Sequence, residues 1–353
     1  MAVFDLEEPL FPFIADYHLP YLVPVVVYWI AGLSFHYIEK QNLFTRFKLH
    51  TPAESLKKDR ASREDVIRCA IMQQAAQVTL GYFTADVEMS AHGHDYHIMI
   101  LAQRLASIFS FLERWKHVAS NQVLNSQSIT RAFFGASFYP NLGEIPNSPS
   151  SNQAYDTLHL DSQVPFVWQY NLGKILYWIL IPMTQFAFAM ILADSFQYFT
   201  HRGFHTNRWL YKNIHSMHHD IFVPFAYGAF YNHPLETIPI DCIGLPICLY
   251  LAGLSNRQSA LFGAIWTYKT VVDHCGYNFP WNPSNIICQN SVLFHDLHHQ
   301  VWGMKYNFSV YTSFWDRVLG TYWDGDDMNA KDKYLRGKEK AKVLVGKEEA
   351  DVK

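Results

Sequence analysis

The chain has 353 residues, of which half are hydrophobic and only 17 % are charged, against roughly 25 % in ordinary soluble domains. This balance fits a membrane protein or a protein with a large aromatic core. The formal net charge of -3 argues against a nucleic-acid-binding surface. The five cysteines form no CxxC pair, and their odd number predicts neither a disulfide framework nor a zinc-thiolate site. They are Cys69, Cys242, Cys248, Cys275 and Cys288.

The first predicted membrane helix follows an acidic, aromatic N-terminal stretch. Between Asp16 and Glu39 the chain has no Asp, Glu, Lys or Arg, and at 1.5 Å per residue this run is long enough to cross a bilayer. A connector rich in Lys and Arg follows, over residues 40–63. The positive-inside rule predicts that this connector is cytosolic and that the N-terminus is lumenal.

Residues 69–85 and 175–193 are the next uncharged runs. The first is short and contains three glutamines, so it is a weaker candidate for a span. The second has the length of a span and continues directly into Asp194 and a histidine pair. We therefore expect the first histidines to lie on the extension of a membrane helix.

Residues 237–255 and 258–268 are apolar apart from Asp241, and neither is a comfortable full span. Together they predict a hairpin that enters the membrane and returns. Such a hairpin brings the residues that follow it back to the cytosolic side.

The region between the second and third runs carries weaker signals. Residues 96–115 are amphipathic and are predicted to lie along the membrane surface, and residues 120–162 have the composition of a long loop. The motif HGHDYH holds His92, His94 and His97 at alternate spacing, which predicts a solvated loop rather than a metal site. The isolated histidines are expected to be structural or exposed; they are His18, His36, His50, His117 and His159.

Ten of the 18 histidines fall between residues 201 and 299, and eight of them form one HxxxH and two HxxHH motifs. On a helix, residues three or four apart share a face, so each motif can present several imidazoles together. Neutral imidazole suits zinc, copper, iron and nickel. No HExxH motif of a hydrolytic zinc site occurs, and eight histidines exceed the needs of one metal. The pattern predicts two metal ions, and a redox pair at a membrane surface suggests iron that activates dioxygen.

Carboxylates near the motifs are expected to compensate the charge of the metals. Four aspartates are placed in the sequence to do so, although each could equally be a helix cap or a surface charge: Asp194, Asp220, Asp273 and Asp296. Asp194 lies two helical turns before His201. It is expected either to accept the ring N–H of a ligand histidine or to mark the membrane boundary.

The motifs HRGFH, HSMHH and HDLHH resemble the histidine boxes of the fatty acid hydroxylase and sterol desaturase superfamily of membrane di-iron enzymes. The phrases DSFQYFTHR, HSMHHDIFVPFAYGAFYNHPLE, KTVVDHCGY, FHDLHHQ and FWDRVLGT are similar to those of the fungal sphinganine C4-hydroxylases, and they cover roughly residues 193–321. With the hydropathy, this resemblance implies an all-α integral membrane protein with about four transmembrane or membrane-embedded helical segments and a cytosolic histidine-box cap. The expected domains are a transmembrane and connector region (1–170), a catalytic domain (171–325) and a charged cytosolic tail (326–353).

The resemblance implies a monooxygenase of the endoplasmic reticulum membrane with its active site facing the cytosol. It would hydroxylate carbon 4 of sphinganine or dihydroceramide, with two iron ions, dioxygen as co-substrate, and electrons from NAD(P)H through cytochrome b5 and its reductase. The implied iron ligands are His201, His205, His215, His218, His219, His274, His295, His298 and His299. Some relatives have a further histidine where this chain has Asn278. His233 stays open, as a ligand or as a packed loop histidine.

Two alternatives remain at the level of sequence. The histidine boxes do not distinguish oxygen insertion from dehydrogenation, so a sterol-modifying oxidase or desaturase of the same superfamily is one alternative. The other is a histidine-rich membrane protein that binds metal without catalysis. Phe225, Tyr227 and Phe230 are expected either to line the alkyl chain of a lipid substrate or simply to pack.

Overall fold

The computed structural model describes residues 9–50, 59–84, 94–120, 166–283, 290–300 and 303–323. These ranges are helical and contain no β-strand, which confirms the all-α prediction. The chain divides into two compact units, residues 1–8 with 89–184 and residues 9–88 with 185–353. The predicted domain boundaries at residues 170 and 325 stay predictions.

The first unit contains α4 (His94–Ser120), α6 (Val167–Ile175) and the π-helical η3 (Leu176–Leu180). The helix predicted over residues 96–115 is present, but the solvated loop predicted for His94 and His97 is wrong, because α4 begins at His94. Ile98, Ala102 and Ala106 are buried at every fourth position, so the apolar face that stabilises the helix reaches its first turns. His92 lies outside the described residues.

Among the described residues, three helices are long and apolar enough to cross a membrane, by length and composition: Asp16–Lys40, Val167–Thr206 and Pro234–Leu251. They coincide with the first and third predicted runs and with the first arm of the predicted hairpin. Residues 63–84, which include the weaker second run, form the helix α3 (Arg63–Thr84) but are not among the three. Its buried Gln73 and Gln74 lower its hydropathy.

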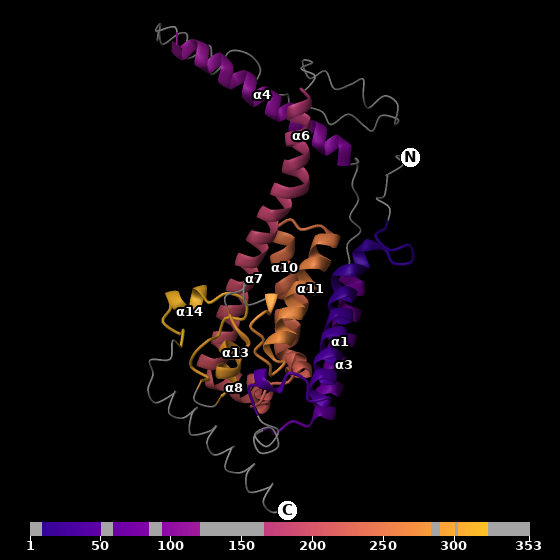
Figure 1. Ribbon diagram of the computed structural model, residues 1–353, viewed down its shortest axis with the longest axis vertical. Coiled ribbons are helices and arrows are strands. Elements are labelled where there is room, and N and C mark those ends of the chain that lie inside the picture. The colour runs from indigo at the N-terminus through magenta and orange to yellow at the C-terminus, as the bar shows by residue number, and fades with distance from the viewer. Residues whose placement is uncertain are drawn as a thin grey trace, which may run out of the picture. The chain divides into compact units, whose positions relative to one another are not determined.

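In the second unit, α1 (Leu19–Lys40) packs along α11 (Asn256–Asp273) and against α3 (Figure 1). Gly263 allows the close approach of α1, because a Cβ atom there would lie 2.9 Å from Cγ of Pro24. The buried Tyr28 donates a hydrogen bond to the carbonyl oxygen of Tyr227, at 2.9 Å. These contacts fix α1 beside the segment that precedes the hairpin.

The predicted hairpin is present as two helical arms. Its first arm consists of α9 (Pro234–Thr237), the π-helical η6 (Ile238–Gly244) and α10 (Leu245–Leu251), and its second arm is α11. The chain reverses at Gly253, whose φ of 70° favours glycine. Ser255 and Gln258 then form a capping box that starts α11.

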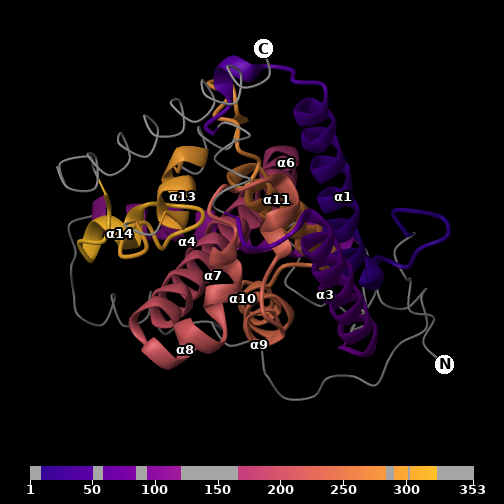
Figure 2. The same cartoon turned by 90° about the horizontal axis from the view of Figure 1, so that it is seen from below.

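The remaining elements of this unit are short. They are η1 (Asp16–His18), η2 (Thr45–Phe47), α8 (Arg208–Asn213), η4 (His215–Asp220), η5 (Ala226–Phe230), α13 (Val292–His299) and α14 (Phe314–Val318). The end of α7 (Ile181–Thr206) lies near α8 and α13 (Figure 1), and Figure 2 shows the same end of the unit from below. This end carries the histidine motifs.

Candidate metal centre

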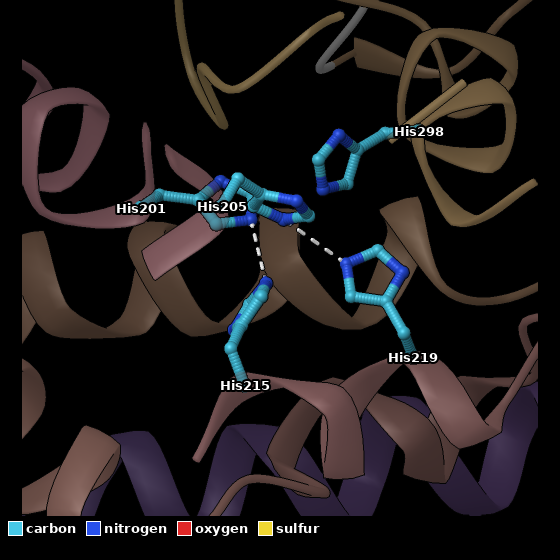
Figure 3. Close-up of side chains that lie close together, drawn as sticks. All are labelled: His201, His205, His215, His219 and His298. Atoms are coloured by element: carbon cyan, nitrogen blue, oxygen red, sulfur yellow. Dashed lines mark hydrogen bonds between the residues drawn. The ribbon is translucent and has the colours of Figure 1, made fainter. Parts of the chain in front are cut away.

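All nine histidines predicted to be ligands lie close together, in two groups. Group A consists of His201, His205, His215, His219 and His298, and group B consists of His218, His274, His295 and His299. Within each group the ring nitrogens that could bind a metal lie within 4.8 Å of one another. Figure 3 shows the five rings of group A pointing toward a common centre. All of these histidines are buried except His205, which is partly exposed.

The helical elements explain how the motifs divide between the groups. On α13, His295 and His299 are four residues apart and share a face, so both belong to group B. His298 precedes His299 by one residue, which turns it by about 100° around the helix axis, and it points into group A. Each HxxHH motif therefore serves both groups, rather than presenting one common face as the sequence suggested.

The second motif forms the 3-10 helix η4 rather than an α-helix. It is held between α8, which starts at the side-chain cap of Asn207, and the loop that leads to η5. From η4, His215 and His219 enter group A and His218 enters group B. His274 joins group B from the C-cap position of α11.

Hydrogen bonds fix the tautomer of six of the nine rings, because Nδ1 faces an oxygen that can only accept. The acceptors are the carbonyl oxygens of Phe308 for His201 (2.7 Å), Tyr231 for His218 (3.3 Å), Thr270 for His274 (2.8 Å), Tyr306 for His298 (2.7 Å) and Ile221 for His299 (2.9 Å), and Oε1 of Glu236 for His215 (2.8 Å). In each ring Nδ1 carries the proton and Nε2 is left with a free lone pair. Such second contacts are typical of metal-ligating histidines.

Several of these lone pairs point at one another. Nε2 of His201 lies 3.2 Å from Nε2 of His215, and Nε2 of His218 lies 3.5 Å from that of His274. Since each of these rings is protonated at Nδ1, neither contact can be a hydrogen bond. A cation shared between the lone pairs turns this repulsion into ligation, so the donor set fits a metal such as iron.

Burial favours the neutral form of several of these rings. Desolvation, followed by the effect of neighbouring imidazoles, lowers the pKa of His218, His219 and His295 well below the ordinary value. Desolvation also lowers the pKa of His274 to about 4. A metal at neutral pH therefore does not have to displace protons from these rings.

The two groups are in contact. The rings of His215 and His218 have centroids 5.5 Å apart, and those of His219 and His299 are 4.9 Å apart. Two cations held by these groups would be close neighbours. This arrangement fits the prediction of a metal pair rather than two independent sites.

Glu236 is a site residue that the sequence analysis missed. Its Oε1 accepts the hydrogen bond from Nδ1 of His215, and both side chains are almost fully buried, at 9 % and 1 % exposed. Its only signal in the sequence is an acidic residue in the first turn of an apolar segment. Glu236 supplies to a histidine of group A the carboxylate contact that was expected from an aspartate.

The role expected of Asp194 as acceptor of a histidine N–H is wrong. Its carboxylate accepts hydrogen bonds from the backbone N–H groups of Tyr311 and Thr312 and from the Thr312 hydroxyl. The other three aspartates pair with Arg60, Lys269 and His50: Asp220 at 3.7 Å, Asp273 at 2.5 Å and Asp296 at 2.7 Å. Among the described residues, none of the four hydrogen-bonds to a histidine of either group.

Asp316 supports the centre indirectly. Its buried carboxylate accepts hydrogen bonds from the N–H groups of Phe308 (3.0 Å) and Ser309 (2.8 Å). These bonds hold the segment whose carbonyl oxygen, on Phe308, orients His201. The phrase FWDRVLGT thus contributes a residue that positions a histidine, which its distance in sequence conceals.

His233 belongs to neither group. Its Nδ1 accepts a hydrogen bond from the N–H of Leu235, at 3.2 Å, and caps the start of α9. This local bond uses the ring nitrogen that faces the helix and explains why a histidine suits this position.

A cavity of about 340 Å³ leads from the histidines along the hairpin. On α11 its lining includes Ser259, Gly263, Thr270 and His274, a distance of roughly 22 Å at 1.5 Å per residue. Of the three aromatic residues considered as walls for an alkyl chain, only Phe230 lines this cavity. Phe225 and Tyr227 pack in the hydrophobic core beside α1.

Comparison with known proteins agrees with this geometry. The fatty acid hydroxylase family model matches residues 186–321. The chain is 32 % identical to a sphingolipid C4-hydroxylase of Schizosaccharomyces pombe, over 91 % of this chain and 93 % of that protein.

Two plant relatives match a shorter part. The chain is 49 % identical to sphinganine C4-monooxygenase 2 of Arabidopsis thaliana and 47 % identical to a very-long-chain aldehyde decarbonylase of Oryza sativa, in each case over 41 % of this chain and 56 % of the relative. No solved structure matches the chain. The similarity along nearly the whole length of the Schizosaccharomyces pombe protein, together with the matched family model, shows that this chain belongs to the fatty acid hydroxylase family, as its histidine boxes predicted.

Proposed function

We propose that this protein is a membrane-bound di-iron monooxygenase that hydroxylates carbon 4 of sphinganine or dihydroceramide, giving phytosphingosine or phytoceramide in sphingolipid biosynthesis. The observation that carries the proposal is the pair of touching groups of closely packed imidazoles at one end of a long cavity. The names of the Schizosaccharomyces pombe and Arabidopsis thaliana relatives supply the substrate class and the position of attack.

In this proposal groups A and B each hold one iron ion. The chemistry that a bound iron pair supplies is the reductive activation of dioxygen and the insertion of one oxygen atom into a C–H bond. The imidazoles with a proton on Nδ1 would hold the metals through Nε2, and the Nδ1–H bonds of His201, His274 and His298 to carbonyl oxygens keep those rings from rotating. The other oxygen atom leaves as water, which requires two electrons and two protons.

The cavity wall determines which carbon atom of the substrate reacts, because the oxidation chemistry itself does not. The methylene groups of an alkyl chain are alike in reactivity, so the carbon that reacts must be chosen by its position. His201, His218 and His274 line one end of the cavity, and a chain lying along α11 presents one segment to them. These three rings are buried, which restricts the access of water to them.

The electrons are proposed to come from NAD(P)H through cytochrome b5 and its reductase, since the chain carries no flavin, nicotinamide or haem motif. We also place the protein in the endoplasmic reticulum membrane with the histidines facing the cytosol. The basic connector over residues 40–63 and the positive-inside rule support this orientation.

Lipid analysis of cells that express the protein tests the proposal. Expression should produce 4-hydroxylated sphingoid bases, and His218→Ala and His298→Ala should abolish them, because the two residues belong to different groups. His97→Ala, the same change in α4, is the matched control and should keep full activity. Altered sterols, or hydrocarbons shortened by one carbon as the rice relative's name suggests, in place of hydroxylated bases would contradict the proposal.

A further inference from the structure

Asp241 is a carboxylate in the middle of the apolar first arm of the hairpin, within the candidate span Pro234–Leu251. Its side chain lines the cavity. It makes no hydrogen bond or ion pair with any other residue in the part of the chain that the structure describes. An ionisable residue inside an apolar span is costly to keep and commonly marks a binding site.

The local backbone holds Asp241 in place. It lies in the π-helical turn η6, a geometry that recurs at functional sites. At the end of this turn, a Cβ atom on Gly244 would lie 2.2 Å from the ring of Phe196, so η6 packs tightly against α7. The carboxylate therefore faces the cavity from a rigid wall rather than from a mobile loop.

The charges of the cavity wall select the kind of ligand. Among the described residues that line it, Glu236 and Asp241 are the acidic side chains and none is Lys or Arg. Glu236 already accepts the hydrogen bond from His215, which leaves Asp241 as the carboxylate available to a ligand. At its own position along the arm, in a region of low dielectric constant, such a group attracts a cation and repels an anion. The metal ions of the proposed function would act on a ligand at the histidine end of the cavity, so the preference for an amine over fatty acids and phospholipids applies to the part of the ligand that lies beside Asp241.

The position of Asp241 fits one end of a sphingoid base. Glu236 marks the histidine end of the arm, and Asp241 lies five residues further along, at most about 7.5 Å at the 1.5 Å rise per residue of an α-helix. The amino group of a sphingoid base is on carbon 2, two positions from carbon 4. An ammonium group bound at Asp241 would keep carbon 4 within the same part of the cavity as the histidines.

We propose that Asp241 binds the protonated amine of a free sphingoid base, so that the cavity prefers long-chain amines to N-acylated or anionic lipids. This inference rests on the proposed function for its substrate. It adds the residue that sets the position of the chain, and it favours sphinganine over dihydroceramide as the substrate.

Equilibrium binding to the iron-loaded, full-length protein without oxygen tests the inference separately from catalysis. The probes are octadecylamine, octadecanol and octadecanoate, which differ in the charge of the head. The unaltered protein should bind the amine most tightly, and Asp241→Asn should weaken amine binding by roughly tenfold or more, as expected for a hydrogen bond to a charged group. Asp241→Glu should keep the preference for the amine, and so should Glu64→Gln, the same carboxylate-to-amide change on the exposed face of α3. An equal preference for the amine in Asp241→Asn, or no preference in the unaltered protein, would overturn the inference.

Turnover separates the two proposals. Asp241→Asn should raise the KM for sphinganine much more than that for dihydroceramide, with the iron content unchanged. Equal changes for both lipids would overturn the role of Asp241 even if carbon 4 is hydroxylated. If the protein binds the amine through Asp241 but hydroxylates neither lipid, the proposed function is refuted and the amine site still stands.

Discussion

A substitution at Glu236 tests how the histidines would hold the proposed metal ions. We predict that Glu236→Gln weakens the binding of one iron ion, the one in group A, and leaves group B intact. The carboxylate lies 2.8 Å from Nδ1 of His215, with both side chains nearly buried. An amide of the same size can still accept the hydrogen bond, but it cannot supply the negative charge that makes His215 a stronger donor to the metal.

The expected size of the effect follows from the geometry. A buried hydrogen bond contributes about 1.5–3 kcal/mol when its acceptor is charged and about 0.5–1.5 kcal/mol when it is neutral, so the loss of the charge costs about 1–1.5 kcal/mol. Since about 1.4 kcal/mol corresponds to a factor of ten in affinity, the iron affinity of group A should fall by roughly tenfold. This value lies at the lower end of the usual effect of removing an outer partner of a ligand histidine.

The effect on iron affinity is measured by iron titration of the purified protein. The iron content per chain is then determined after dialysis against a weak chelator. Glu236→Gln should retain about one iron under conditions in which the unaltered protein and the control Glu64→Gln retain about two, as expected if His215 serves only group A. Retention of both ions with unchanged affinity would refute the role of Glu236. Loss of both ions together would refute the division into two groups.

Three further predictions concern the supports of the centre. Asp316→Asn should lower the iron affinity of group A less than Glu236→Gln does. Asp316 acts one step further away, because it holds the segment whose Phe308 carbonyl orients His201, whereas Glu236 contacts His215 itself. An unchanged iron titration would contradict this. His233→Ala should leave the iron content unchanged and lower the thermal stability slightly by removing the cap of α9, and loss of an iron would show that it is a ligand. The iron-free protein should lose stability as pH falls from about 6.5 toward about 4. The pKa of His274 is about 4 in the folded state, so over this range the unfolded state binds more protons than the folded state. A thermal unfolding temperature that does not change with pH would contradict the burial of this ring in its neutral form.

The sequence predicts well those features that depend on near neighbours in the chain. The run between Asp16 and Glu39 forms a helix long enough to span a membrane. The spacing of the histidine motifs correctly indicates residues that lie together, since positions four apart share a helix face. His274 was placed with them by the resemblance alone, because one histidine at the end of a helix has no local pattern.

Features that depend on distant partners could not be read from the sequence. Glu236 contacts His215 across 21 residues, and Asp296 meets His50 across 246. Nothing in the local pattern of His50 separates it from an exposed histidine, yet it is buried. Asp194 has the right spacing to face His201, but the segment at residues 311–312 supplies nearer donors.

The division of each HxxHH motif between two groups also depends on the packing of α13 against its neighbours. The sequence shows which residues can share a face, but not that a second face of the same helix meets another group of histidines. In α4, the loop predicted from HGHDYH failed for a related reason, since the apolar face that extends the helix begins with the buried Ile98.

In the proposed function, two groups of histidines in one chain direct oxygen to carbon 4 of a sphingoid base. The most direct measurement supplies the purified, iron-loaded protein with a reducing system, sphinganine and oxygen gas enriched in oxygen-18, and locates the label in the product by fragmentation mass spectrometry. We predict one labelled oxygen atom at carbon 4 and no product from His218→Ala or His298→Ala. Label at another carbon, a desaturated product without label, or equal turnover by a protein loaded with zinc alone would contradict it.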